Sequence, residues 1–429
     1  MEKKQRTGIY LTTRQVIDNP DYVPTLRDRI GLNLAVLSFS GEVPSEVREK
    51  SPFDGVPLSD ACLHSLVNRH MDGGPVDPLE FDTVRKQQGP AVSAGGDDAE
   101  MNRAIDLLRR AGVEIWFCAS SWTGRRLMFC PSHPEVDAWF EAFYLHIATN
   151  YDVDGLDITH ARYPMGSFPR GLFSCACNRC AQAATEMGYD MEQMTGALQA
   201  GLERLRTVDA QLLAQVCKSG AGPFDFLQLM EMRPGIVEWF RFRTELLTKR
   251  LQGYHQSVHA AAGNDFIFGT DTHPASLGPF VGHNHADWAT FSDFASPLVS
   301  HISAFLCDPL IVWARFLQET VPGLNESDAL QIIYRFTGYD GMGLPETIAD
   351  FDPENPSRLA HIIPLEELVM RDLLKARLYL PPEIPSYPII HGAGWPRQAI
   401  DPIARRSAEA GHDGVVWQGT DELVDFPLK

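Results

Sequence analysis

The feature that most constrains the fold is a regular alternation of short apolar runs with longer helical patterns along the 429-residue chain. Runs separated in this way are typical of βα units, whose strands pair in parallel. Eight such runs predict strands, at residues Gly8–Thr13, Leu32–Phe39, Val113–Ala119, Gly155–Thr159, Phe266–Asp271, Leu298–Ser303, Pro388–Gly392 and Gly414–Gln418. Eight parallel strands predict a closed (β/α)8 TIM barrel.

Helical patterns fill the gaps between these strands. They predict helices over Asp98–Ala111, Pro134–Asn150, Met191–Cys217, Gly235–Ala262 and Pro402–Ala410. The last has proline at its start and Gly411 just past its end, which is the expected asymmetry of helix ends. We expect residues 1–429 to form one barrel domain, with inserted segments at about 41–96 and 164–262. Both insertions follow strands, at the end of a barrel where active sites lie.

Charge and hydropathy limit the partners of the chain. The formal net charge of −19 argues against nucleic acid, because phosphate binding needs clustered Lys and Arg. The start MEKKQRTGIYLTTRQV lacks the apolar run of a secretory signal, and no stretch approaches eighteen consecutive apolar residues. We therefore expect a cytoplasmic protein with no membrane partner and a small-molecule ligand. A homo-oligomer is left open.

The spacing of the cysteines predicts a metal site. Cys175, Cys177 and Cys180 form Cys-x-Cys-x-x-Cys just before a helix, a pattern that suits tetrahedral zinc and requires a fourth ligand. Cys130 is the preferred fourth ligand, because its loop and the loop after strand four share one rim of the barrel. Cys118 is the alternative, but it lies inside strand three. Four thiolates leave no open position, so this zinc would be structural, and we expect no organic cofactor.

The segment CPSHPEVDAWFEAFYLHIATNYDVDGLDITHARYP, followed by CACNRC, resembles a group of glycoside-hydrolase-like barrels. Its cysteine pattern is similar to that of the family 42 β-galactosidases, whose barrels carry a structural zinc on cysteines with this spacing. The segment DTHPASLGPFVGHNHADW also looks like a loop of uncharacterised relatives in that group. The resemblance implies a carbohydrate substrate. It also implies that Cys130, Cys175, Cys177 and Cys180 are the zinc ligands.

The chain departs from these families at their catalytic positions. Family 42 enzymes have an Asn-Glu pair at the end of strand four and a nucleophilic Glu on strand seven. Here strand four ends Asp157-Ile158-Thr159-His160, and strand seven carries His391 with no carboxylate. Family 18 chitinases have a similar strand-four motif, but Thr159 and Ala161 replace its third Asp and its Glu. Neither mechanism is therefore carried over.

Glycosidic cleavage commonly needs two carboxyl groups across one substrate. Asp157 on strand four and Asp271 at the end of strand five are our predicted catalytic pair, because neighbouring strands lie only about 4.8 Å apart. The alternative is that each is a barrel-interior acid satisfied by hydrogen bonds or by an arginine. Asp308, Asp421 and Glu422 are further acids near the same end of the barrel.

Several other side chains are predicted at this rim. The predicted substrate-binding residues are His160, Arg162, His273, His391 and Trp417. His283, His285 and His301 cluster in the same loops, and His283 and His285 with Asp271 form an alternative metal site. Trp122, Trp313 and Trp395, like Trp417, either stack on sugar rings or pack in the core.

The leading hypothesis is a glycoside hydrolase (glycosidase) of carbohydrate metabolism that acts on a soluble glycoside or oligosaccharide through paired carboxylates. A metal-dependent hydrolase or lyase is one alternative, and a catalytically inactive carbohydrate-binding barrel is the other. The sequence specifies neither the sugar, nor the linkage, nor a retaining or inverting outcome.

Overall fold

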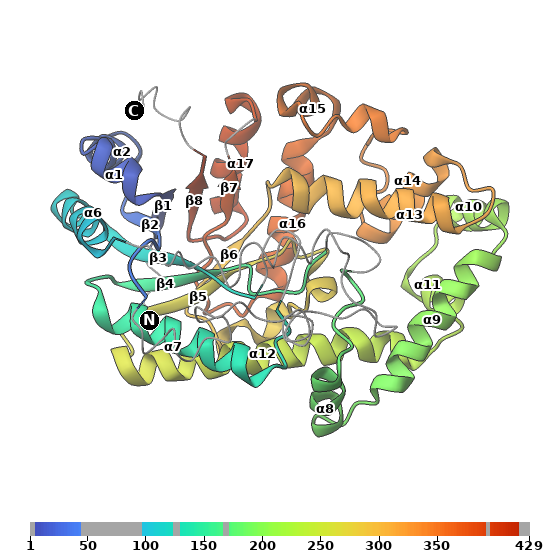
Figure 1. Ribbon diagram of the computed structural model, residues 1–429. Helices are drawn as coiled ribbons and strands as arrows, with labels where there is room; N and C mark the ends of the chain where they lie inside the picture. The colour runs from blue at the N-terminus through green and yellow to red at the C-terminus, as the bar shows by residue number, and fades with distance from the viewer. Residues whose placement is uncertain (1–4, 44–96, 123–128, 166–170, 392–394, 420–429) are drawn as a thin grey trace.

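The computed structural model describes residues 5–43, 97–122, 129–165, 171–391 and 395–419 (Figure 1). Its eight parallel strands confirm the predicted (β/α)8 barrel, in the order β6-β5-β4-β3-β2-β1-β8-β7. Two isolated bridges, Ala295–Ser386 and Leu298–Ile389, join β6 to β7 and close the cylinder. The strands are β1 (Arg6–Leu11), β2 (Leu34–Ser38), β3 (Glu114–Ser120), β4 (Gly155–Thr159), β5 (Ile267–Thr272), β6 (Ala295–Pro297), β7 (Ile389–His391) and β8 (Gly414–Gln418).

Helices surround the barrel and extend to one side of it (Figure 1). Those up to β5 are α1 (Thr13–Asp18), α2 (Tyr22–Ile30), α6 (Asp98–Ala111), α7 (Pro134–Asn150), α8 (Asn178–Glu186), α9 (Met191–Thr207), α10 (Ala210–Ser219), α11 (Pro223–Leu229) and α12 (Pro234–Ala262). Those after β5 are the 3-10 helices η1 (Gly278–Val281), η2 (His285–Thr290) and η4 (Ile348–Phe351), the π-helix η3 (Ser303–Val312), α13 (Trp313–Thr320), α14 (Glu326–Thr337), α15 (Pro356–Ile362), α16 (Leu365–Tyr379) and α17 (Arg397–Glu409). Among the described residues, no helix is long and apolar enough to span a bilayer.

Alternate residues of each strand face opposite sides, so the core has two layers. A small cluster fills the inside of the barrel and includes Val36, Trp116, Phe294 and Val416. A much larger cluster lies between the strands and the surrounding helices. The side chains at inward positions near the carboxyl ends of the strands therefore reach the barrel mouth.

Three predicted elements are corrected. Strand six lies at Ala295–Pro297, before the predicted 298–303, because the chain turns into the π-helix soon after Leu298. The predicted helix 191–217 is two helices, since Asp209 begins α10 by accepting a hydrogen bond from the Leu212 N–H at 2.8 Å. The last helix begins at Arg397, so Pro402 lies inside it. Residues 44–96 of the predicted insertion at about 41–96, together with Asp421 and Glu422, lie outside the described residues.

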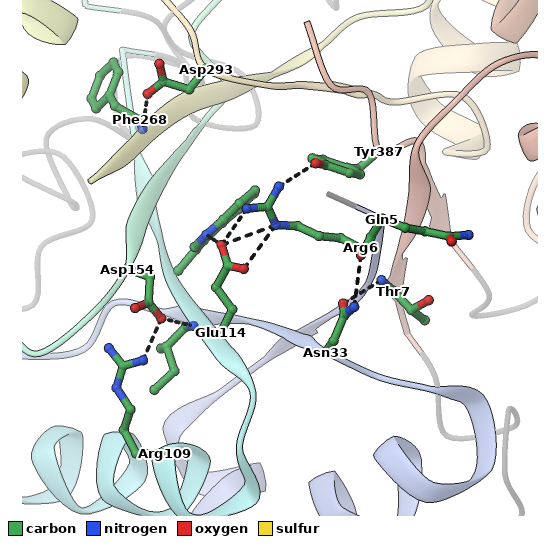
Figure 2. Close-up of polar contacts among 12 residues, drawn as sticks. Gln5, Arg6, Thr7, Asn33, Arg109, Glu114, Asp154, Phe268, Asp293 and Tyr387 are labelled. Carbon is green, nitrogen blue, oxygen red and sulfur yellow. Dashed lines mark hydrogen bonds and ion pairs between the residues drawn. The ribbon is translucent and has the colours of Figure 1, made fainter. Parts of the chain in front are cut away.

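The amino ends of the strands carry paired charges (Figure 2). The Arg6 guanidinium lies 2.8 Å from the Glu114 carboxylate, donates to the Tyr387 hydroxyl, and stands over the Trp116 ring. Asp154 accepts hydrogen bonds from the Ile115 N–H at 2.8 Å and from Arg109 at 2.7 Å. Charged groups at this end of the barrel therefore stabilise one another.

Candidate functional site

Two buried acids meet at the barrel mouth from neighbouring strands. Cys118 on β3 lies opposite Asp157 on β4, which in turn lies opposite Gly269 on β5. Asp271 is two residues further along β5 and therefore shares the inward parity of Asp157. The predicted pair thus occupies adjacent inward positions, and Asp271 lies nearer the mouth.

Asp157 lies deep in this group and is 1% exposed. Its Oδ2 accepts a hydrogen bond from the Tyr10 hydroxyl at 2.6 Å, whereas its Oδ1 has no hydrogen-bond partner among the described residues. Burial, reinforced by the charge of Asp271, raises the pKa of Asp157 to about 7, although the Tyr10 hydrogen bond acts in the opposite direction. This carboxyl group can therefore hold a proton near neutral pH.

Asp271 has the opposite character. Arg162 lies 3.2 Å from its Oδ2, and the His160 N–H donates to its Oδ1 at 3.1 Å. Burial alone would raise the pKa of Asp271, but the charges of Arg162 and His160 outweigh burial and lower it. Asp271 is therefore ionised at neutral pH. The two acids form a pair whose pKa values are pushed apart, as in many acid–base sites.

The turn after β4 directs the backbone N–H of His160 at Asp271. His160 has φ 62°, a left-handed conformation that is uncommon for a residue other than glycine. Two hydrogen bonds hold the turn: Thr159 Oγ1 with His160 Nδ1 at 2.8 Å, and the Arg162 N–H to the His160 carbonyl at 2.8 Å. Strained backbone of this kind is often found at functional sites.

Histidines line the same mouth. His273 is 2% exposed, and neither of its ring nitrogens has a hydrogen-bond partner among the described residues. His301 Nε2 lies 2.8 Å from Gln418 Oε1, and its ring is 4.5 Å from that of His391. Burial lowers the pKa of His301 to about 3 and that of His273 well below its usual value. These neutral imidazoles can each donate and accept hydrogen bonds, as sugar hydroxyls require.

The alternative metal site at His283 and His285 is not formed. His283 Nε2 lies 3.1 Å from the Ala161 carbonyl, and its Nδ1 accepts from the His273 N–H at 3.1 Å, so both nitrogens are used. Within the described chain, groups of three or more possible ligands close enough to share one ion are four cysteines and a cluster of His255, His259 and Asp293.

The tryptophans pack in the core. Trp417 is 7% exposed and belongs to the large core cluster, as do its neighbours across the strands, Ile9 and Ile390. Trp122, Trp313 and Trp395 are buried in the same cluster. We therefore assign Trp417 to packing rather than to substrate contact. Its strand parity, opposite to that of Val416, is the signal that sequence reasoning overlooked.

Three further side chains belong to this neighbourhood. Asp308 on η3 is half-buried, and burial raises its pKa to about 6 while the charge of Arg162 lowers it. Tyr10 and Gln418 were missed by the sequence analysis, although both lie at inward positions near the ends of β1 and β8. Counting in steps of two along these strands would have found them.

An apolar cavity of about 170 Å³ lies elsewhere, between the helices of the second insertion and α13–α14. Leu205, Phe226, Phe280 and Phe336 are among its lining residues. It offers no acid, base or metal ligand. This cavity therefore lacks the acids and histidines that gather at the barrel mouth.

The four predicted cysteines form one buried cluster. Cys130 Sγ lies 3.4 Å from Cys180 Sγ and 3.6 Å from Cys177 Sγ, and the sulfur atoms of all four, with Cys175, lie within 4.8 Å of one another. Sulfur atoms about 2.3 Å from a tetrahedral zinc would lie about 3.8 Å apart. The cluster therefore has the composition and size of a metal site. Cys118, the alternative ligand, faces the barrel interior instead.

Arg243 places a buried positive charge beside this cluster. It is fully buried, donates to the Leu172 carbonyl, and its guanidinium stands 3.9 Å from the centre of the Tyr163 ring. Burial lowers its pKa to about 10, while Tyr163, Cys180 and Cys175 act to raise it. A zinc with four thiolates carries two negative charges, so a buried cation here is the expected counter-charge.

Comparison with known proteins bears on the fold. No family model matches the chain, and no curated protein matches it in sequence. The catalytic domain of a β-amylase from Paenibacillus polymyxa superposes with a TM-score of 0.50 at 8% identity, over 96% of this chain and 91% of that one. The chain shares the (β/α)8-barrel fold of that β-amylase domain.

A β-galactosidase from the Antarctic haloarchaeon Halorubrum lacusprofundi gives a TM-score of 0.47 at 13% identity, over 96% of this chain and 52% of that one. A β-galactosidase from the psychrophilic Marinomonas ef1 gives 0.36 at 9% identity, over 72% and 42%. This chain thus spans about half the length of those two proteins. At such identities the likeness concerns the fold alone.

Proposed function

We propose that this chain is a glycoside hydrolase that acts on a soluble glycoside or oligosaccharide at the carboxyl end of its barrel. The observation that carries the proposal is the pairing of Asp157 with Asp271. Asp157 is buried and can stay protonated near neutral pH, whereas Asp271 is kept ionised by Arg162. Two carboxyl groups with separated pKa values are what glycosidic cleavage requires.

The roles follow from the protonation states. Asp157, with a pKa of about 7, would donate its proton to the glycosidic oxygen as the bond to the leaving group breaks. Asp271 would act on the anomeric centre, either directly or through a water molecule that it deprotonates. Arg162 keeps Asp271 charged, while His160, His273 and His391 supply hydrogen bonds to sugar hydroxyls.

A screen of chromogenic glycosides tests this function, with a structure of any hit bound. Hydrolysis that is lost in Asp157→Asn and in Asp271→Asn, and is indifferent to chelators of accessible metal, supports the proposal. Activity that a chelator abolishes and added metal restores would favour the metal-dependent hydrolase or lyase. Sugar binding without turnover in the unchanged protein would instead identify a carbohydrate-binding barrel that has lost catalysis.

We further propose that Cys130, Cys175, Cys177 and Cys180 hold a structural zinc. Four buried thiols beside the buried Arg243 fit this ion, and a closed four-thiolate site takes no part in the reaction. The ion would join the segment before α7 to the segment that begins α8. We also keep the single-domain hypothesis for residues 1–429.

Cys180→Ala tests the zinc. The variant should lose about one zinc per chain by elemental analysis, together with a large part of the folding stability, because metal binding to such sites contributes folding free energy. Cys307→Ala, a half-buried cysteine outside the cluster, is the matched control and should keep its zinc. Native protein without zinc would refute the assignment.

A further inference from the structure

A second group of potential metal ligands lies near the amino end of β5, away from the barrel mouth. His255 and His259 are one turn apart on α12 and therefore point from the same face of the helix. Asp293, just before β6, faces both rings. The three side chains are between 15% and 19% exposed, so the group is largely buried and still reachable from solvent.

The ligand atoms around Asp293 are close enough to share one ion. His255 Nε2 lies 3.2 Å from Oδ1 of Asp293, and His259 Nε2 lies 2.9 Å from Oδ2. Nitrogen and oxygen ligands about 2.0 to 2.1 Å from a tetrahedral ion would lie about 3.3 Å apart. The observed separations are thus close to those around a bound ion, and the three ligand atoms all lie within 4.8 Å of one another.

The surrounding contacts fix the group in place. The Phe268 N–H donates to Asp293 Oδ2 at 2.8 Å, as Figure 2 shows, so the carboxylate is held by the backbone of β5. The two imidazole rings lie 4.1 Å apart at an interplanar angle of 31°. Metal sites commonly hold their carboxylate ligands with outer hydrogen bonds of this kind.

We propose that His255, His259 and Asp293 form a second metal site, which takes one zinc or a similar divalent transition ion. Two imidazoles and one carboxylate suit such ions rather than magnesium or calcium, which prefer oxygen ligands alone. A water molecule would complete a four-coordinate ion. Because two ligands come from α12 and the third, Asp293, lies just before β6, the ion would tie this helix to the sheet.

Cobalt titration distinguishes this site from the cysteine cluster. Protein whose tightly held metal has been quantified is titrated with Co²⁺ and followed by absorbance and calorimetry. If the site exists, the protein should bind one further equivalent of Co²⁺. This bound Co²⁺ should show weak visible absorption bands and lack the intense near-ultraviolet charge-transfer band of thiolate ligands. Zinc in place of cobalt should raise the melting temperature, because an ion that binds only the folded state stabilises it.

Variants make the test decisive. His255→Gln with His259→Gln should weaken the added equivalent at least tenfold and abolish the rise in melting temperature, whereas His361→Gln, on the exposed end of α15, should behave as wild type. If the double variant fails to fold, Asp293→Asn keeps an acceptor for the Phe268 N–H and should show the same loss. Failure of the wild type to bind the added equivalent, or binding undiminished in the folded variants, would overturn the proposal.

Discussion

The two ends of the barrel differ in how completely their polar side chains are paired. At the amino end, Arg6 is matched by Glu114, and Asp154 is matched by Arg109 and a backbone N–H (Figure 2). At the carboxyl end, Asp157 has an oxygen with no described partner and a pKa near 7, and His273 has no described partner for its ring. Satisfied groups stabilise a fold, whereas unsatisfied buried groups are retained where a ligand uses them.

The largest expected effect is a loss of reaction rate, caused by a substitution at the carboxyl end of the barrel. Asp157→Asn should lower kcat on a glycoside identified in the screen by about 10²- to 10⁴-fold, because the amide N–H is not acidic enough to protonate the leaving group. Rates measured at saturating substrate, with folding followed by circular dichroism, check this. Asp265→Asn, an exposed aspartate before β5, is the control and should keep full activity. An unchanged rate in Asp157→Asn would move the acid role to Asp308.

At the amino end of the barrel, a substitution should lower the free energy of unfolding and leave the reaction rate unchanged. Arg6→Met leaves Glu114 buried without its cation, and losing one partner of a buried pair typically lowers the free energy of unfolding by about 3 to 5 kcal/mol. Denaturant titration measures this, and the activity per folded molecule should not change. Arg206→Met removes an exposed pair with Glu203 and should cost under about 1 kcal/mol. Equal losses in both variants would contradict the contrast between the ends.

The pH dependence of stability sharpens the comparison. The folded pKa of Asp157 is about 7 and its usual value is 3.8, so between these values the folded protein binds the proton that the unfolded chain has released. Stability therefore falls as pH rises from about 4 to 7, by up to about 1.4 kcal/mol per pH unit from this group. Asp157→Asn should remove that contribution. Stability curves of wild type and variant that stay parallel over this range would refute the raised pKa.

The smallest expected effect concerns Tyr10. Its hydroxyl donates to Asp157 and lowers the pKa of that carboxyl, so Tyr10→Phe should raise the pKa. One hydrogen bond of about 1 kcal/mol corresponds to somewhat under one pH unit. The alkaline limb of the kcat profile should move to higher pH by that amount, with little change at the optimum. A shift to lower pH would contradict the assignment of Asp157 as the acid.

The fold was predictable because it depends on repetition. Each βα unit has its own apolar run and amphipathic helix, so errors at single boundaries, such as the early position of β6, leave the count of eight intact. The cysteine cluster was predictable for a similar reason, since ligand spacing within one loop limits where the sulfur atoms can go. The predictions of the fold and of the cysteine cluster both rest on patterns among residues that are close in sequence.

The mouth was harder to predict because its contacts join distant strands. Asp157 and Asp271 were found from parity, but the Tyr10 hydroxyl reaches Asp157 across 147 positions of sequence. His283 stayed an alternative metal ligand in the sequence because nothing local shows that the Ala161 carbonyl and the His273 N–H occupy its nitrogens. Trp417 was misjudged because its position at a strand end was given more weight than the face on which its side chain lies.

The closure of the barrel has a consequence for its motions. Between β6 and β7, both three residues long, the cylinder is joined by two isolated bridges rather than by a continuous ladder. Few cooperative hydrogen bonds protect the amides there, so hydrogen exchange should occur through local opening of this seam well below the free energy of global unfolding. The seam leads to His301 on one side and His391 on the other, with the Ser300 hydroxyl accepting the His391 N–H at 2.6 Å. A sugar bound by both histidines would bridge the seam and slow its opening.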